Sequence, residues 1–300
     1  MRPHTFKLCL VVLIFSIVSA CATQTKTLPT SNLESSLRVA TFNIAYLSLN
    51  EKGIKNWNDR KESVALMIED IAPDIMGFQE MESFGGAHSR NENFQLDYVL
   101  KEHPSYAAAA YAKDASQYPI TQPIIYKKDK FDVLDQGFFF FSDTPNTIYS
   151  STFNGSYPAF CSWATFKNIK TDKSFTVFNM HTDYASKSNR LKSAELITAR
   201  ISPRVTSGDT VILLGDLNAS YKSKPAKLLK TIPLEFVPPA GSTFHFNKGL
   251  NITSAIDHIL HTADVEPVGE LIVSRKKYAK QWPSDHYPIA ADLKFTNNRN

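Results

Sequence analysis

Acidic, amide and imidazole side chains stand at the ends of several short hydrophobic runs in this sequence. The residues that share this position are Asn43, Glu80, His181, Asp216 with Asn218, and, ahead of the last such run, Asp285 with His286. Short hydrophobic runs predict strands. Strands that end in such groups place them along one edge of a sheet, where a charge stays hydrated or holds a metal ion. This edge is the candidate active site.

Each of these signals is weak when it is taken alone. An asparagine after a strand is usually a turn residue, and residues 215–218, Gly-Asp-Leu-Asn, also fit an ordinary polar turn. His181 alone fits a structural histidine, and Asp257 with His258 fits a solvated pair. Only their combination in this order favours an active site over these alternatives.

Further short runs show where the supporting elements lie. Strand character is found at residues 37–42, 75–79, 124–126, 138–141, 163–166, 175–179, 211–214 and 290–295. Helical periodicity is found at residues 61–71 and 191–201. The phenylalanine run at 138–141 fits either a membrane-inserting patch or a buried strand, and we expect the strand. One domain over residues 37–296, with strands dominating and at least two helices beside them, is predicted.

The composition is that of a globular protein. Of 300 residues, 43% are hydrophobic, 12% aromatic and 21% charged, which excludes global disorder and collagen-like or coiled-coil repeats. The 33 Lys and Arg against 29 Asp and Glu give a net charge of +4 without a long basic run. Charge therefore neither requires nor excludes a nucleic-acid partner.

The N-terminal segment indicates export. Arg2 and Lys7 precede an apolar run at 8–18 that is too short to span a bilayer, which is typical of a signal peptide over residues 1–20. The small residues before Cys21 resemble the lipobox of bacterial lipoproteins, which implies acylation of Cys21 and a lipid anchor in the membrane. A soluble secreted protein with an incidental Cys21 is the alternative. Ala22 resembles an outer-membrane sorting residue for a Gram-negative host.

Residues 21–36 read as a flexible tether, because after Cys21 they are rich in Thr, Ser and Asn and lack aromatic side chains. Cys9 leaves with the signal peptide and Cys21 is lipidated in this interpretation, so Cys161 is the remaining thiol. No intrachain disulfide is then expected.

Ordered sequence blocks resemble the endonuclease/exonuclease/phosphatase superfamily, which includes DNase I-like nucleases, sphingomyelinases and inositol-polyphosphate phosphatases. The blocks lie at residues 41–44, 73–80, 179–183, 215–218, 256–259 and 284–288, supported by Trp57 with Arg60, residues 123–126, Arg190 with 193–194, and 243–245. The resemblance covers almost all of residues 37–295. It implies a four-layer α/β/β/α sandwich of the DNase I-like type, with the site between two sheets.

The resemblance also implies roles for the residues at the sheet edge. Glu80 is the expected principal ligand of Mg²⁺, with Mn²⁺ as an alternative, and Asn43 and Asp285 assist it; hard cations prefer such oxygens. Asp216 activates the attacking water and Asn218 holds that water or the phosphate. His286, paired with Asp257, neutralises a phosphoryl oxygen, and His181 is a second imidazole facing the phosphate.

Other residues are weaker candidates for substrate contacts, and the chain departs from the family at two places. The candidates are Arg190, Tyr126, Asp183 and His245. Related sequences carry an arginine where this chain has Ala159, and an acidic residue just before the block at 123–126, where this chain has residues 120–122. Losing one such donor costs roughly a hundredfold or more in rate. Arg190 and Lys187 are the candidate replacements, and the partner of His181 is left open.

The expected activity is a metal-dependent phosphoesterase, preferentially a phosphodiesterase, acting as a monomer on a phosphate ester by in-line displacement. Nucleic acid, a sphingomyelin-type lipid and a phosphomonoester are candidate substrates. Lysines at 127, 128, 222, 224 and 227 are scattered rather than aligned in a strand-binding groove, and no exposed aromatic hairpin stands out. A catalytically silent, membrane-anchored binding protein on the same fold is the competing hypothesis, motivated by Ala159.

Overall fold

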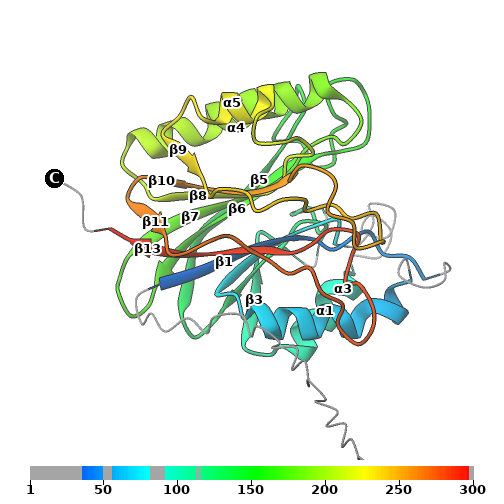
Figure 1. Cartoon of the computed structure of the whole chain (residues 1–300). Helices are drawn as coiled ribbons and strands as arrows, with labels where there is room; N and C mark the ends of the chain where they lie inside the picture. The colour runs from blue at the N-terminus through cyan, green and yellow to red at the C-terminus, as the bar shows by residue number, and fades with distance from the viewer. Residues whose placement is uncertain (1–35, 50–55, 82–91, 113, 115, 297–300) are drawn as a thin grey trace, which may run out of the picture. The chain divides into compact units, whose positions relative to one another are not determined.

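The computed structural model describes residues 36–49, 56–81, 92–112, 114 and 116–296. These residues belong to one unit of the chain, Ser31–Asn300. Two β-sheets pack face to face, and helices cover the outer face of each sheet (Figure 1). The predicted α/β/β/α sandwich is confirmed. The predicted signal peptide, Cys21 and the predicted tether before Ser36 lie outside the described residues.

The first sheet joins the N-terminal part of the domain to its C-terminal end. Its strand order in the described residues is β11-β13-β1-β2-β4-β3, with β12 paired to β13. The strands are β1 (Ser36–Asn43), β2 (Ile75–Gln79), β3 (Tyr106–Ala109), β4 (Ile124–Lys127), β11 (Val265–Pro267), β12 (Ile272–Val273) and β13 (Ile289–Phe295). Only β1 and β2 are parallel, so their carboxyl ends share one edge.

The second sheet is built from the middle of the chain. Its order is β5-β6-β7-β8-β10-β9 within the described residues. The strands are β5 (Phe131–Phe140), β6 (Phe160–Asn168), β7 (Ser174–His181), β8 (Val211–Asp216), β9 (Leu234–Phe236) and β10 (Asp257–Thr262). Here β7 and β8 are parallel, and β10 runs antiparallel to β8. The start of β10 therefore meets the ends of β7 and β8 at one edge.

Helices form the two outer layers. They are α1 (Trp57–Ile71) and α3 (Phe94–Glu102) on the first sheet, and α4 (Lys187–Thr206) and α5 (Lys224–Leu229) on the second (Figure 1). Asn56 caps α1 by accepting from the backbone N–H of Asn58, and α1 ends before Pro73. None of the helices in the part of the chain that the structure describes has the length and apolar character needed to cross a bilayer.

An apolar core fills most of the space between the sheets. It includes Val39, Ile75, Phe166, Val177 and Ile212, all of which are buried. A second cluster packs α4 and α5 on the outer face of the second sheet, and it contains Phe139 and Phe141. The phenylalanine run at 138–141 is thus largely a buried strand, as predicted. Cys161 is buried in the same cluster with a free thiol.

A buried polar bridge joins the two sheets just behind the site edge. The Gln79 side-chain amide donates to Asn179 Oδ1 at 2.6 Å, and Asn179 Nδ2 donates to the Phe78 carbonyl at 2.8 Å. Gln122 donates to the Asn179 carbonyl at 2.9 Å and to the Phe160 carbonyl at 3.1 Å. Buried amides that are bonded in this way fix the relative position of the sheets where the two halves of the site meet.

The predicted strands and helices are present, although several are longer than their hydrophobic runs. The helix predicted at 61–71 begins at Trp57, and that at 191–201 spans Lys187–Thr206. The elements that the sequence did not predict are α3, α5, β3, β9, β10, β11 and β12. Most are short, and β10 interrupts its apolar pattern with Asp257, His258 and His261, all of which are buried.

Candidate active site

The strand register brings the predicted site residues to one edge of the sandwich. On the second sheet, His181 and Asp257 both lie opposite Asp216, from the two neighbouring strands. On the first sheet, Asn43 pairs with Gln79, and Glu80 follows directly. Gly215 is required for this approach, since a side chain there would clash with the Met180 carbonyl.

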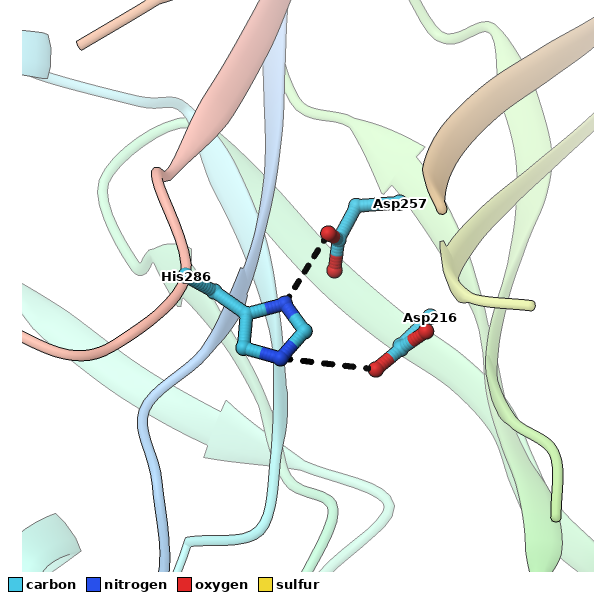
Figure 2. Close-up of side chains that lie close together, drawn as sticks. All are labelled: Asp216, Asp257 and His286. Atoms are coloured by element: carbon cyan, nitrogen blue, oxygen red, sulfur yellow. Dashed lines mark hydrogen bonds and ion pairs between the residues drawn. The ribbon is translucent and has the colours of Figure 1, made fainter. Parts of the chain in front are cut away.

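His286 lies between two buried carboxylates. Its Nδ1 is 3.0 Å from Asp257 Oδ2 and its Nε2 is 3.9 Å from Asp216 Oδ2 (Figure 2). Burial would lower the pKa of His286, but Asp257, Asp216 and Asp285 outweigh it and raise the pKa to about 10. The ring is therefore an imidazolium near neutral pH. The predicted pairing of His286 with Asp257 is confirmed.

The two carboxylates beside His286 differ in their acidity. Burial and the charge of Asp257 raise the pKa of Asp216 to about 6. Burial would also raise the pKa of Asp257, but its charge interaction and hydrogen bond with His286 lower it. Asp257 therefore stays ionised as the partner of the ring, and Asp216 is the group poised to exchange a proton near neutral pH.

His181 stands between the two sheets. Its Nε2 is 3.7 Å from Glu80 Oε1 and 3.8 Å from Asp216 Oδ2, which identifies the acidic neighbours that the sequence left open. Burial lowers the pKa of His181, and the charge of His286 lowers it further against the opposing effect of Asp216. His181 is thus a neutral imidazole that faces both halves of the site.

Glu80 is held in position by neutral donors. Asn43 Nδ2 donates to Glu80 Oε1 at 3.1 Å, and the Tyr46 backbone N–H donates to Oε2 at 3.3 Å. Its backbone is in the left-handed region (φ 58°), which is uncommon for a non-glycine residue and indicates a constrained position. Burial raises the pKa of Glu80. The side chain remains 23% exposed, so one face of the carboxylate is accessible.

Asn43 has a different role from the predicted one. Its Oδ1 accepts the backbone N–H of Ala45 at 3.1 Å, so its Nδ2 points at Glu80 and, at 3.2 Å, at Asp216 Oδ2. In this orientation the amide presents hydrogens to the two carboxylates rather than an oxygen to a cation. Asn43 therefore aligns Glu80 with Asp216, and its predicted role as a metal ligand is not supported by the geometry.

A divalent cation fits the Glu80 part of the site. Glu80 and the half-buried Asp285 offer hard carboxylate oxygens, and Asp285 is close enough to raise the pKa of Glu80. The described neighbours within bonding distance of Glu80 supply no positive charge, because His181 is neutral. A cluster of Asp216, Asp257 and His286 also brings ligand atoms within 4.8 Å, but the His286 imidazolium already supplies a positive charge between these carboxylates.

Asn218 closes the second-sheet side of the site. Its backbone N–H donates to Asp216 Oδ1 at 2.7 Å, and its Nδ2 donates to the Thr182 carbonyl at 2.9 Å. Its backbone is left-handed (φ 50°), a conformation that asparagine tolerates better than most residues. Asn218 thus fixes one oxygen of Asp216 and keeps its amide beside that carboxylate, where the sequence placed it.

Arg60 is a positioning residue whose role the sequence analysis did not predict. Its buried guanidinium donates from Nη1 to the Ile44 carbonyl at 2.6 Å and the Pro283 carbonyl at 2.9 Å, and from Nη2 to Ala45 at 2.8 Å. It therefore ties the loop after Asn43 to the loop before Asp285. The signal was in the sequence, because Arg60 lies on the same helical face as Val64 and Met67.

Two weak candidates prove to be structural. Asp183 accepts the backbone N–H groups of Ala185 at 2.8 Å and Ser186 at 3.0 Å, and Asn189 donates to its other oxygen at 2.8 Å. Arg190 donates to the carbonyls of Asp183 at 2.7 Å and of Tyr184 at 2.9 Å. Both side chains thus build the start of α4, and neither takes the predicted place at the substrate.

The other two weak candidates are also corrected. Tyr126 lies opposite Ile75, at the start of β2, whereas Glu80 follows the end of that strand. Its ring packs on Phe166. His245 is buried and stacks on Tyr287 at 4.2 Å between ring centroids. Its backbone N–H donates to the Asp285 carbonyl at 2.8 Å, so it supports the loop of Asp285 from behind.

The position of the missing arginine is apolar. Ala159 is buried in the cluster under α4, and its carbonyl accepts from the Phe141 N–H at 2.8 Å. Arg190 does not replace the arginine, since its Nη1 is bound to backbone carbonyls. Lys187 is exposed at the start of α4. The charge that faces Asp216 in the described residues comes instead from His286.

Comparison with known proteins identifies the family of the chain. Residues 40–286 match the model of the Endonuclease/Exonuclease/phosphatase family, and the chain belongs to that family. An endonuclease/exonuclease/phosphatase family protein from Bacteroides thetaiotaomicron has a similar structure, with a TM-score of 0.75, 25% identity, and coverage of 88% of this chain and 99% of the other. The family and its fold thus make the chain a member of a group of phosphoesterases.

Two further relatives were found. A mannosyl-6-phosphatase from the same organism superimposes with a TM-score of 0.74 at 25% identity, covering 87% of this chain and 100% of that protein. An uncharacterized protein of Acanthamoeba polyphaga mimivirus is 26% identical over 175 residues, or 56% of this chain. The match spans 62% of the length of that viral relative.

Proposed function

We propose that this protein is a divalent-metal-dependent phosphodiesterase that hydrolyses a P–O bond by in-line attack of a water molecule. One observation carries the proposal: the His286 imidazolium lies between the carboxylates of Asp257 and Asp216, at the same edge as the accessible carboxylate of Glu80. A positive ring, a carboxylate near its pKa and a cation-binding carboxylate together are the groups that phosphoryl transfer needs.

Asp216 accepts the proton of the attacking water in this mechanism. One oxygen is fixed by the Asn218 N–H, and the other faces Asn43, His181 and His286. A carboxylate with a pKa of about 6 is ionised in most molecules at pH 7 and still takes up a proton readily. Asn43 and Asn218 hold the two oxygens in fixed directions, so the water is positioned without reorganisation.

His286 stabilises the negative charge that develops on the phosphoryl oxygens. Its Nδ1 hydrogen is used by Asp257, while Nε2 is 3.9 Å from Asp216, beyond hydrogen-bond distance. The Nε2 hydrogen can therefore donate to a phosphoryl oxygen. Glu80 and Asp285 would hold the divalent cation, which when bound polarises the phosphoryl group and offsets its charge. His181, neutral and facing both halves, donates or accepts a hydrogen bond at the same group.

The proposed setting is the outside of the inner membrane. Residues 1–20 and 21–36 are proposed to be a signal peptide and a tether with acylated Cys21, which anchors the enzyme in the outer membrane of a Gram-negative host. The enzyme is proposed to act as a monomer. It would then meet phosphate esters from outside the cytoplasm, such as nucleic acid or lipid headgroups.

Two competing functions have specific support. The mannosyl-6-phosphatase relative favours a phosphomonoester attached to a sugar. The buried, apolar position of Ala159 favours a silent binding protein, since a donor expected for this family is missing there. The intact arrangement of Glu80, Asp216 and His286 argues for catalysis.

The test uses the full chain in detergent with bis-(p-nitrophenyl) phosphate and p-nitrophenyl phosphate, with Mg²⁺, Mn²⁺ or EDTA. We expect metal-dependent turnover with preference for the diester. Asp216→Ala and His286→Ala should each lower it by about a hundredfold or more, while the exposed Asp172→Ala and the outer-layer His103→Ala, chosen as matched controls, should retain it. Preference for the monoester would support the sugar phosphatase, and a folded protein without turnover would support the binding protein.

A further inference from the structure

Exposed aromatic side chains stand beside the site on two opposite flanks. Tyr184 is 71% exposed and Phe246 is 44% exposed, although large aromatic rings generally gain by burial. Each belongs to a loop at the same sheet edge as Asp216. Each ring also packs against a second aromatic ring, which holds it in position.

The Tyr184 flank borders the Glu80 half of the site. The Tyr184 ring stacks on Tyr157, with 5.8 Å between centroids and an interplanar angle of 23°, and the Tyr184 N–H donates to the Tyr157 hydroxyl at 3.1 Å. Burial raises the pKa of Tyr157 well above its ordinary value, and the charges of Asp183 and Glu80 raise it further. The Tyr157 ring therefore connects the exposed ring to the catalytic edge.

The Phe246 flank borders the His286 half. Phe246 packs on Phe244 at 4.4 Å between centroids, and Phe244 packs on the His286 ring at 4.9 Å. Phe244 also forms an antiparallel bridge with His286. Phe246 and the next residue, Asn247, both have left-handed backbones (φ 57° and 59°), so the loop holds this ring outward in a constrained conformation.

The strand order places the catalytic groups between these two rings. Tyr157 precedes β6 and Tyr184 follows β7, while Phe244 and Phe246 precede β10. The second sheet runs β6-β7-β8-β10, and Asp216 ends the strand between β7 and β10. The Tyr157 and Tyr184 rings thus belong to loops on the β7 side of Asp216, and the Phe244 and Phe246 rings pack from the side of His286.

We infer that Tyr184 and Phe246 are ring-binding residues that select a phosphodiester with a planar or sugar ring on each side of phosphorus. The inference rests on the proposed function and names the substrate class of the same site. Aromatic side chains bind such rings by stacking, at a gain of about 1–3 kcal/mol per nucleobase. A monoester carries a single organic group and would leave one of the two rings without a partner.

Two aryl esters with the same leaving group test the inference. Bis-(p-nitrophenyl) phosphate carries a ring on both sides, and methyl p-nitrophenyl phosphate carries one only on the leaving group. Of Tyr184→Ala and Phe246→Ala, we expect one to lower kcat/KM for both esters, because it removes the contact with the leaving ring. The other variant should lower kcat/KM only for the bis-aryl ester. Each loss should be about five- to 150-fold.

The controls separate stacking from general damage to the site. Tyr184→Phe keeps the ring and should retain at least half of the activity on both esters. Ile252→Ala removes an exposed side chain without a ring (74% exposed) and should leave kcat/KM for both esters unchanged. If both alanine variants affect the two esters equally, or leave both unchanged, the inference is wrong.

Binding measured without turnover keeps this inference separate from the proposed function. In EDTA, calorimetric titrations of the full chain compare dimethyl phosphate with the thymidine dinucleotide dTpdT and the phosphodiester that joins the 6-hydroxyl groups of two glucose molecules. Tighter binding of one ring-bearing diester, lost in Tyr184→Ala and Phe246→Ala, supports the inference and tells a nucleobase from a sugar. Equal binding of all three overturns it. Failure of the wild type to hydrolyse bis-(p-nitrophenyl) phosphate with metal, while it still binds a ring-bearing diester, would count against the proposed function alone.

Discussion

The two halves of the site differ in how completely their charges are partnered. On the second sheet, His286 lies between Asp257 and Asp216, so the positive and negative groups of the half are already matched. On the first sheet, the described residues that donate hydrogen bonds to Glu80 are neutral, namely the Asn43 amide and the Tyr46 backbone N–H, and the neighbouring His181 is neutral as well. The His286 half therefore has its charges paired at contact distance. In the Glu80 half, the positive groups Arg60 and His286 act on Glu80 through their charge, without a hydrogen bond to it among the described residues.

This difference assigns separate tasks to the two halves. A buried carboxylate without a cation is costly, which is why burial raises the pKa of Glu80. A divalent ion relieves that cost, so the Glu80 half is where metal dependence should originate. The His286 half needs no added charge and should contribute to the rate without contributing to metal affinity. Variants that separate rate from metal binding therefore test the comparison directly.

The largest effect should follow from Glu80→Gln, which keeps the shape of the side chain and removes its charge. We expect kcat/KM on bis-(p-nitrophenyl) phosphate to fall about a thousandfold, because the cation that offsets the phosphoryl charge is no longer held. Binding of Mn²⁺, followed by electron paramagnetic resonance, should weaken in parallel. Glu195→Gln, an exposed change on α4, is the matched control. Unchanged Mn²⁺ affinity in Glu80→Gln would place the metal elsewhere.

His286→Ala should lower kcat/KM about a hundredfold, since it removes a preorganised donor to the phosphoryl oxygen. Mn²⁺ affinity should stay within about threefold of the wild type, because His286 belongs to the half that is already matched. The same titration that is used for Glu80→Gln measures it. A loss of Mn²⁺ binding as large as in Glu80→Gln would show that the His286 ring is part of the metal site. It would contradict the assignment of metal binding to the Glu80 half alone.

Asp257→Asn should change the pH dependence more than the rate at low pH. Asp257 is the main group that raises the pKa of His286 to about 10. Without its charge, burial lowers that pKa, so the ring loses its proton as the pH rises. In this variant we expect kcat/KM to be roughly tenfold lower at pH 8 and to recover toward pH 6. In the wild type, loss of the His286 proton should not lower kcat/KM below about pH 9. The pH profile of kcat/KM, with the His286 signal in NMR spectra, checks it.

The smallest effect on catalysis should come from Asp183→Asn. Asp183 accepts two backbone N–H groups at the start of α4, so losing its charge should lower the free energy of unfolding by about 1 kcal/mol. Activity should stay within twofold. Urea unfolding and kcat/KM on the same preparation measure both, with the exposed Asp172→Asn as the control. A large loss of activity without loss of stability would return Asp183 to the substrate site.

The sequence was most informative where chemistry and pattern coincide at a strand end. Glu80, Asp216 and His286 were found because each stands next to a hydrophobic run, and the runs themselves became β2, β8 and β13. The start of β10 was recognised only through its resemblance to a family block. Its pattern is broken by buried histidines that find partners inside the fold, such as His258 on the Ala219 carbonyl.

The predictions that failed depended on strand direction and on contacts between distant residues, which the sequence pattern does not contain. The prediction that Tyr126 contacts the substrate was wrong, because the direction of β4 relative to β2 decides which end of the strand meets the site. Asn43 was assigned as a ligand, but the Ala45 N–H fixes its amide the other way round. Arg60 lies just before the helix predicted at 61–71, and its role depends on carbonyls from two distant loops.

The sequence by itself determined the kinds of groups present, the strands that end in them and the family to which they belong, because side-chain chemistry and periodicity are local properties. Only the tertiary structure decided which groups are neighbours, how they are protonated and which carboxylate lacks a cation. Those properties depend on strand order, strand direction and burial, which arise from contacts between residues far apart in the chain, such as Glu80 with His181 and Asp216 with His286.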